Sequence, residues 1–297
     1  MKSESFKAWQ PLTFGGVARY GHDWLGKLLF ACLIVSVLTG SVILWSVGRA
    51  WFPVIEEAIT HLPPGAEIRA GRLTSPAPMR LSENLFLAIS LDPIGGASLP
   101  SLADIQVILK PDHIRFRSLF GDQPVPYRPE WNIQLTRTDW EPRWAAWKPG
   151  IMAYTFFGTM AALFTSWISL GIIYAIPARI MAFILKRSLS LWGAWKLSVA
   201  ALLPAAILLT VAIGVYGLGQ IRIAGLLVAW ALHFVVGWIF IVGAMIRLPR
   251  IQKIKNPFGE PAFDDERNED DEIERVEKNP FKAAAAAKGK RGGPPSS

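Results

Sequence analysis

Residues 197–246 read LSVAALLPAAILLTVAIGVYGLGQIRIAGLLVAWALHFVVGWIFIVGAMI, two apolar runs joined by a short turn. Each run, 197–218 and 223–246, is long enough to cross the hydrocarbon core of a bilayer, which takes about 20 apolar residues. Because the connection between them is so short, we expect two neighbouring antiparallel transmembrane helices.

Two further stretches meet the same criterion of length and polarity. They are residues 24–47 and 151–178, and the middles of all four spans lack Asp, Glu, Lys and Arg. The whole chain of 297 residues is 52% hydrophobic, contains 13 Trp and has a mean hydropathy of +0.31, which is too apolar for a soluble protein. The sequence therefore predicts an integral membrane protein with four transmembrane α-helices.

The net charge of +8 is distributed in a way that predicts topology. The loop 179–196 and residues 247–255 each contain four Lys or Arg residues, whereas the turn between the last two spans contains only Arg222. Short cytoplasmic loops are the ones enriched in these cations. We therefore expect both termini in the cytoplasm, residues 48–150 on the extracytoplasmic side, and a location in the plasma (inner) membrane.

Both ends of the chain differ from the spans. Residues 1–23 combine aromatic side chains with a few cations, which is typical of a cytoplasmic segment in the headgroup layer. The first span is expected to be a retained signal anchor, because its apolar core is longer than that of a cleaved signal peptide. The tail 247–297 contains the acidic block FDDERNEDDEIERVE, bracketed by two copies of KNPF. It is predicted to be disordered from about residue 256 and to offer a site for a cytoplasmic partner.

Residues 48–150 are predicted to form a small α+β domain that contains a sheet. WFPVIEEAITHL at 51–62 has the spacing of an amphipathic helix. LFLAISLD at 85–92 and DIQVILKPDHIRFRS at 104–118 alternate with the period of strands, the second breaking at Pro111 and Asp112. AEIRAGRL and EWNIQLT are weaker strand candidates. We expect a sheet that is apolar on one face.

Polar groups in this domain suggest few sites. Glu57 and His61 have a spacing that can hold a metal, but no third ligand is nearby, so a solvated pair is the favoured interpretation. Asp92, Asp104, Asp112 and Asp122 could converge, although separated acids are more often turn residues.

A basic stripe on the predicted strand after Asp112 is the clearest surface feature. It consists of His113, Arg115 and Arg117. Such a stripe attracts an anionic partner, for example lipid headgroups or an anionic envelope polymer, or it simply discourages pairing of a sheet edge, which is the favoured interpretation.

His233 is the one histidine near the centre of a span. An ionisable group at that depth is a functional candidate. The alternative is a hydrogen bond that locks the bundle, with Thr159 or Thr165 of the second span as the expected partner. The absence of charged partners in the spans favours the hydrogen bond.

The layout resembles a bacterial family of membrane proteins, the domain of unknown function 1189. The resemblance is carried by LP, Ile68 and GRL at 71–73, ISLD at 89–92 and VILKPDHI at 107–114, and it covers roughly residues 20–250. It implies one span, a soluble domain and a cluster of three spans, but no reaction. The last three spans are also similar in hydropathy to Yip1-like membrane proteins.

Three functions are open at this stage. The favoured one is a non-enzymatic protein that senses, binds or scaffolds something in the envelope through its extracytoplasmic domain, such as an envelope protein or anionic polymer. The alternatives are a small transporter or channel using the three-helix cluster with His233, and an enzyme acting on membrane lipid. We found no catalytic motif and no metal or cofactor signature, and the only cysteine, Cys32, lies within a span. The basic charge flanks the spans, so we expect the bilayer and no nucleic acid as a partner.

Overall fold

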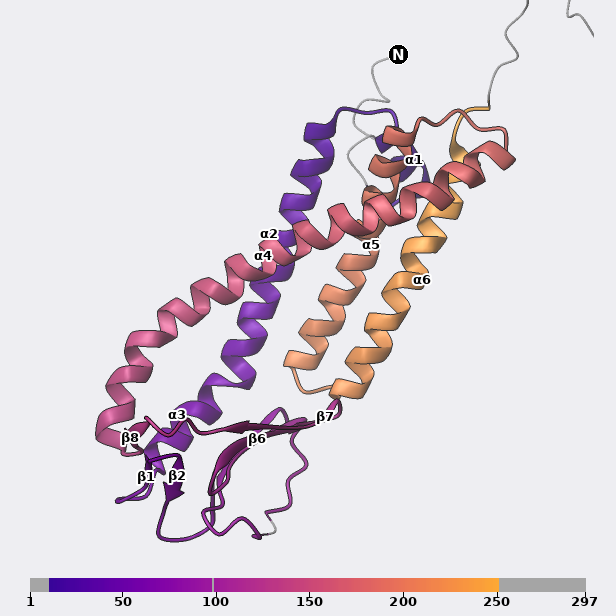
Figure 1. Cartoon of the computed structure of the whole chain (residues 1–297). Coiled ribbons are helices and arrows are strands. Elements are labelled where there is room, and N and C mark those ends of the chain that lie inside the picture. Colours follow the sequence, from indigo (N-terminus) through magenta and orange to yellow (C-terminus); the bar gives the residue numbers. More distant parts are fainter. Residues whose placement is uncertain (1–10, 98, 251–297) are drawn as a thin grey trace, which may run out of the picture. The chain divides into compact units, whose positions relative to one another are not determined.

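The computed structural model describes residues 11–97 and 99–250, which form one compact unit (Figure 1). Four of the described helices are long and apolar enough to cross a membrane. They are α2 (Leu25–Ala50), α4 (Arg137–Ile184), α5 (Leu191–Gly217) and α6 (Ile223–Arg247). The fold is mostly helical with a small sheet region, which agrees with the predicted class at this level. The expectations for the acidic block, the KNPF repeat and a tail-bound partner lie outside the described residues.

Helix α5 is the centre of the helical bundle. It packs against α2, α4 and α6, and a continuous set of its small side chains is fully buried, including Ala200, Ala201 and Ala205. Small residues let helix backbones approach closely. The resulting van der Waals packing is what holds apolar helices together in apolar surroundings. Among the described residues a buried hydroxyl pair also crosses the bundle, with Thr39 Oγ1 of α2 lying 2.7 Å from Thr210 Oγ1 of α5.

The short helix α1 (Phe14–Tyr20) is part of this bundle. Thr13 caps it by accepting a hydrogen bond from the amide of Gly16 at 3.0 Å. Val17 and Tyr20 are buried, and the Phe14 ring lies 5.0 Å from that of Phe240 on α6. The described part of the predicted interfacial segment therefore packs on α5 and α6.

Helix α4 is longer than the span that hydropathy marks out. It begins at Arg137, where the Thr136 side chain accepts from the amide of Asp139, and it runs without interruption to Ile184. Residues 137–150, which precede the predicted span and contain Trp140, Trp144 and Trp147, are thus the first part of the same helix, and the three prolines within α4 do not break it.

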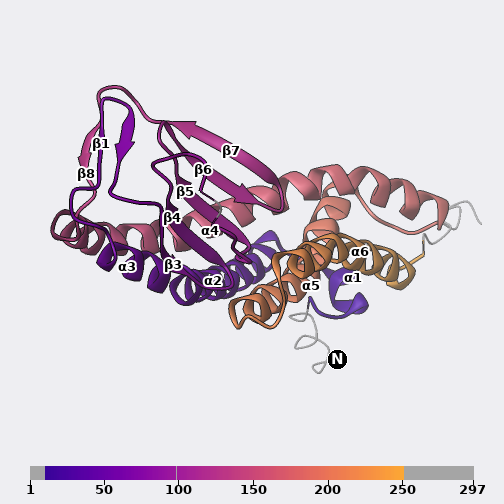
Figure 2. The ribbon, with the colours of Figure 1, turned by 90° about the horizontal axis from the view of Figure 1, so that it is seen from below.

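The remaining described elements, residues 52–134, form what we call the sheet domain (Figure 2). It begins with helix α3 (Phe52–Thr60). A three-stranded sheet of order β2-β1-β8 contains β1 (Glu67–Arg69), β2 (Arg72–Thr74) and β8 (Asn132–Gln134). A five-stranded sheet of order β3-β4-β5-β6-β7 contains β3 (Met79–Glu83), β4 (Leu87–Leu91), β5 (Ile105–Leu109), β6 (His113–Ser118) and β7 (Gly121–Pro126). All pairings are antiparallel except β4 with β5.

The parallel pairing of β4 and β5 explains why β4 is buried on both faces. Leu87 and Leu91 are buried on one face, and Ala88 and Ser90 on the other. Parallel neighbours require a crossover connection, and here the Gln106 side chain of β5 donates to the carbonyl of Ser101 within that connection at 3.0 Å. The expected apolar face is present on β4 as Leu87, Ile89 and Leu91, but the opposite face of this strand, with Ala88 and Ser90, is buried as well.

Gly171 of α4 tests the close approach of α4 to α5. A Cβ at this position would lie 2.4 Å from Cγ2 of Val199, a β-branched side chain that is stiff in a helix. We expect Gly171→Ala to lower the free energy of unfolding in detergent by about 1–3 kcal/mol through overpacking. Gly158→Ala is the matched control on the same helix, since its Cβ would meet only the Tyr154 ring at 3.9 Å. Equal stabilities for the two variants would contradict this packing.

Candidate functional site

A carboxylate of the sheet domain binds the beginning of α6. Asp104 Oδ1 accepts from Nε of Arg222 at 3.1 Å, and Oδ2 accepts from the backbone amide of Ile223 at 3.3 Å. The Asp104 side chain is only 5% exposed. The first amides of a helix have no partner within the helix and carry partial positive charge, so a carboxylate stabilises them. We call the Asp104 carboxylate, the Arg222 guanidinium and the Ile223 amide the clamp.

Apolar and backbone contacts surround the clamp. The ring of Phe86 packs edge-on against Tyr216 of α5, with centroids 5.0 Å apart. Arg222 also donates from Nη2 to the carbonyl of Leu102. A Cβ built on Gly219 would lie 3.4 Å from Leu85. The turn between α5 and α6 therefore rests on the β3–β4 turn and on the residues that precede β5.

A second attachment joins the sheet domain to α4. Glu56 of α3 accepts from Nζ of Lys148 at 2.6 Å and from Nε1 of Trp144 at 3.2 Å. The bond from Lys148 lowers the pKa of Glu56 below its usual range. A third attachment is the bond from Nδ2 of Asn84 to the carbonyl of Ala50, at the end of α2, at 2.6 Å. Hydrogen bonds thus join the sheet domain to three helices of the bundle, α2, α4 and α6.

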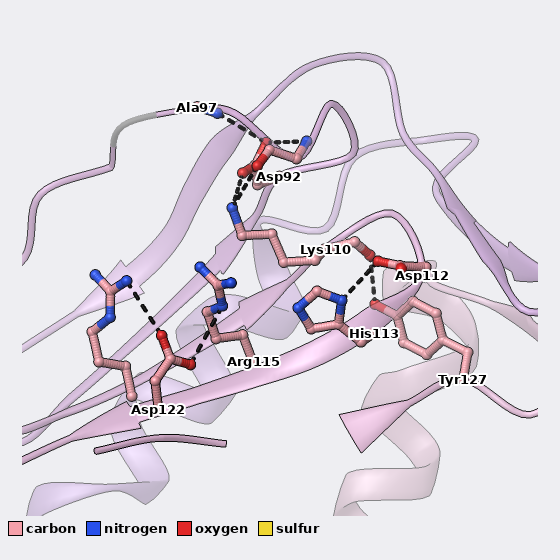
Figure 3. A network of polar contacts seen from close by, with 10 residues as sticks. Asp92, Ala97, Lys110, Asp112, His113, Arg115, Asp122 and Tyr127 are labelled. Atoms are coloured by element: carbon pink, nitrogen blue, oxygen red, sulfur yellow. Dashed lines mark hydrogen bonds and ion pairs between the residues drawn. The ribbon is translucent and has the colours of Figure 1, made fainter. Parts of the chain in front are cut away.

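Inside the sheet domain the main polar feature is a buried ion pair (Figure 3). Lys110 Nζ lies 2.5 Å from Oδ2 of Asp92, and their side chains are 9% and 0% exposed. Amides of Gly95 and Ala97 donate to Oδ1, and Lys110 also donates to the carbonyl of Gly95. Burial alone raises the pKa of Asp92, but these hydrogen bonds outweigh it and hold the pKa below its ordinary value. The chain itself supplies the partners of both charges, which is typical of a structural pair.

The predicted basic stripe lies on β6 and is paired with acids of the same domain (Figure 3). Nδ1 of His113 is 2.7 Å from Oδ1 of Asp112, and this bond lowers the pKa of Asp112. Arg115 and Arg117 each lie 3.4 Å from Asp122 on β7. The pairing neutralises part of the stripe, as expected for charges on the outer side of a sheet near its edge.

The four aspartates of the sheet domain do not converge. Asp92, Asp104, Asp112 and Asp122 each pair with a different set of cations. In residues 11–97 and 99–250 no group of three or more His, Cys, Asp or Glu side chains is placed to hold a metal ion.

Glu57 and His61 hold α3 on the sheet. Ser82 Oγ of β3 donates to Oε2 of Glu57 at 2.6 Å, and Nδ1 of His61 lies 3.0 Å from the carbonyl oxygen of Leu81. Both side chains are exposed, in line with the expectation of a solvated pair, but each bonds to β3, and no hydrogen bond or ion pair joins the two in the described part of the chain.

The structure does not bring together the polar candidates of the predicted spans, His233, Thr159 and Thr165. Nδ1 of His233 is at hydrogen-bonding distance from the carbonyl of Trp230 in its own helix, and its ring lies 3.9 Å from that of Phe234. Thr159 is half-buried and Thr165 is exposed on α4. In the described part of the chain no hydrogen bond joins either of them to His233. The interhelical hydroxyl bond instead joins Thr39 and Thr210, as described above.

Comparisons with protein-family models, with curated proteins and with solved structures find no match. The candidate site therefore rests on its own geometry. Its principal residue, Asp104, was one of four unassigned acids in the sequence. The sequence offers one partial signal, since Arg222 is the lone cation in a turn between two apolar runs, but this does not identify its partner.

The buried pair gives a direct prediction about stability. Lys110→Met leaves the carboxylate of Asp92 buried without its cation, so we expect a loss of about 3–5 kcal/mol in the free energy of unfolding. The double variant Asp92→Asn, Lys110→Met removes both charges and should lose less. Chemical denaturation monitored in detergent provides the measurement.

Lys148→Met is the matched control, because it removes a cation whose side chain is 37% exposed in its pair with Glu56. We expect it to cost at most about 1 kcal/mol. Because the folded pKa of Asp92 lies below its unfolded value of about 3.9, the parent should also lose stability as pH falls into this range, and the double variant should lose less. A loss for Lys110→Met no larger than that for the control would contradict a structural role.

Proposed function

We propose that this chain is a non-enzymatic protein of the plasma (inner) membrane. Its four apolar helices cross the bilayer, both termini are cytoplasmic, and the sheet domain lies on the extracytoplasmic side. The distribution of Lys and Arg supports this orientation, because residues 179–196 and 247–255 contain four each, whereas the α5–α6 turn contains only Arg222. The clamp is consistent with it, because the sheet domain meets the bundle at that turn. We also propose membership in the domain of unknown function 1189 family, on the motifs quoted above.

Within this arrangement we propose that the sheet domain binds or senses a component of the envelope. The observation that carries the proposal is the clamp between the sheet domain and the beginning of α6. A ligand or partner on the sheet domain that shifts β5 also shifts Asp104, and therefore acts on the end of a spanning helix. Such a junction suits a sensor or scaffold.

The contacts of the charged groups favour this function over catalysis or transport. The charged side chains of the sheet domain that are named above bond to other groups of this chain, either within the domain or on the bundle. His233 bonds to a carbonyl of its own helix. A non-enzymatic binding or sensing role is therefore better supported than a transporter or a lipid-acting enzyme.

One pair of positions tests both location and binding. Glu130, in the loop after β7, and Ser188, between α4 and α5, are both exposed. In a Cys32→Ala background we expect Glu130→Cys to react with an impermeant maleimide on intact cells, and Ser188→Cys to react only after permeabilisation. A photo-crosslinking residue at 130 should form adducts with an envelope component, and these should persist when residues 260–297 are deleted.

Two results would contradict the proposal. Reaction of Ser188→Cys on intact cells would overturn the orientation. Adducts that form only from position 188, or that vanish with the tail deletion, would overturn binding through the sheet domain.

A further inference from the structure

Four large apolar side chains of the sheet domain are exposed in its loops near the clamp. Leu85 is 49% exposed, Leu102 83%, Leu119 59% and Phe120 74%. Single exposed apolar residues are ordinary on protein surfaces, whereas several at one place indicate a contact surface. We call these four residues the apolar end.

Strand register places all four at the same end of the five-stranded sheet. Ile105, which follows Asp104, pairs with Leu87 on one side and with Ser118 on the other. Ser118 in turn pairs with Gly121 across the β6–β7 turn, which contains Leu119 and Phe120. The apolar end therefore includes the β3–β4 turn, the approach to β5 and the β6–β7 turn.

This end of the sheet is the one that meets the bundle. Asp104 bonds to the first amide of α6, and Leu85 lies against the α5–α6 turn at Gly219. Within α6 the outward side chains are apolar and half-exposed or more, such as Val228 at 60% and Leu232 at 50%. If α6 crosses a bilayer, the surface of that bilayer lies close to the beginning of α6, which is where the apolar end is found.

The local charges and backbone suit a lipid surface. Arg117 and Arg222 flank the apolar end, and each is paired with an acid, Asp122 or Asp104, so the end presents no unpaired charge of these two cations to the lipid. Within the β6–β7 turn, Ser118 Oγ accepts from the amide of Phe120 at 3.2 Å. That bond satisfies a backbone donor which would otherwise be costly to move out of water.

We propose that the apolar end, led by Leu119 and Phe120, inserts into the extracytoplasmic leaflet of the bilayer that the helices cross. The inference rests on the proposed function, because it requires α5 and α6 to span. Lipid is the occupant since the apolar end lies at the same end of the sheet as Asp104, which bonds to the first residue of α6, where the exposed apolar surface of that helix begins. The sheet domain is then held on the membrane surface at two places at the same end of its sheet, the inserted β6–β7 turn and the clamp at Asp104.

The test uses the full chain in lipid nanodiscs, with Cys32→Ala and one new cysteine carrying bimane. The test position is Phe120→Cys. The matched control is Ile94→Cys, since Ile94 is also an apolar residue with 74% exposure but follows β4 at the opposite end of the sheet. The reference is Val235→Cys on α6, where Val235 is 53% exposed. Quenching by aqueous iodide and by spin-labelled lipid is measured for each.

We expect bimane at 120 to be quenched by spin-labelled lipid and to be several-fold less sensitive to iodide than bimane at 94. Its depth should correspond to about 5–10 Å, at the boundary between headgroups and acyl chains. Equal iodide quenching at 120 and 94, with lipid quenching at 235, would overturn the insertion and leave the spanning helices intact. Protection from both quenchers at 120 would also overturn it, in favour of a protein contact. A lack of lipid quenching at 235 would overturn the proposed function together with the inference.

Discussion

The bond between Asp104 and the first turn of α6 is the contact on which the arrangement of the molecule depends. The beginning of a helix presents amides without partners. The N-cap residue of α6, Arg222, makes no side-chain hydrogen bond to these amides. Asp104 provides the missing acceptor from another part of the chain and pairs with Arg222 at the same time. A carboxylate at a helix N-terminus contributes about 0.3–1 kcal/mol when exposed and up to about 2 kcal/mol when partly buried, as it is here.

The bundle provides the rigid side of this junction. Small side chains along α5 allow α2, α4 and α6 to approach it, and the Thr39–Thr210 bond joins two of the helices. The sheet domain provides the other side, in which the buried Asp92–Lys110 pair fixes the crossover connection beside β5. Because β5 begins directly after Asp104, the position of this carboxylate depends on the sheet domain as well as on the helical bundle.

Patterns local in sequence predicted much of the fold. The four apolar helices follow from runs of apolar residues, and the strands β4, β5 and β6 follow from alternation of side chains over a few residues. The site depended on contacts between distant residues, which such patterns do not contain. Neither the parallel pairing of β4 with β5 nor the bond between Asp104 and Arg222 has a local signature. For the same reason, local patterns do not reveal that Glu57 and His61 bond to β3. Nor do they reveal that His233 bonds to Trp230 of its own helix and not to Thr159 or Thr165.

Hydrogen exchange of the amides in the first turn of α6 and in the β3–β4 turn measures the clamp most directly. Asp104→Ala removes the shared carboxylate, and Asp122→Ala removes an acid whose ion pairs, with Arg115 and Arg117, lie within the sheet domain. With a cap worth about 1–2 kcal/mol, we predict exchange about five- to thirtyfold faster in both regions for Asp104→Ala. Asp122→Ala should leave them unchanged. Unchanged exchange in Asp104→Ala would contradict the claim that this carboxylate joins the sheet domain to the helices.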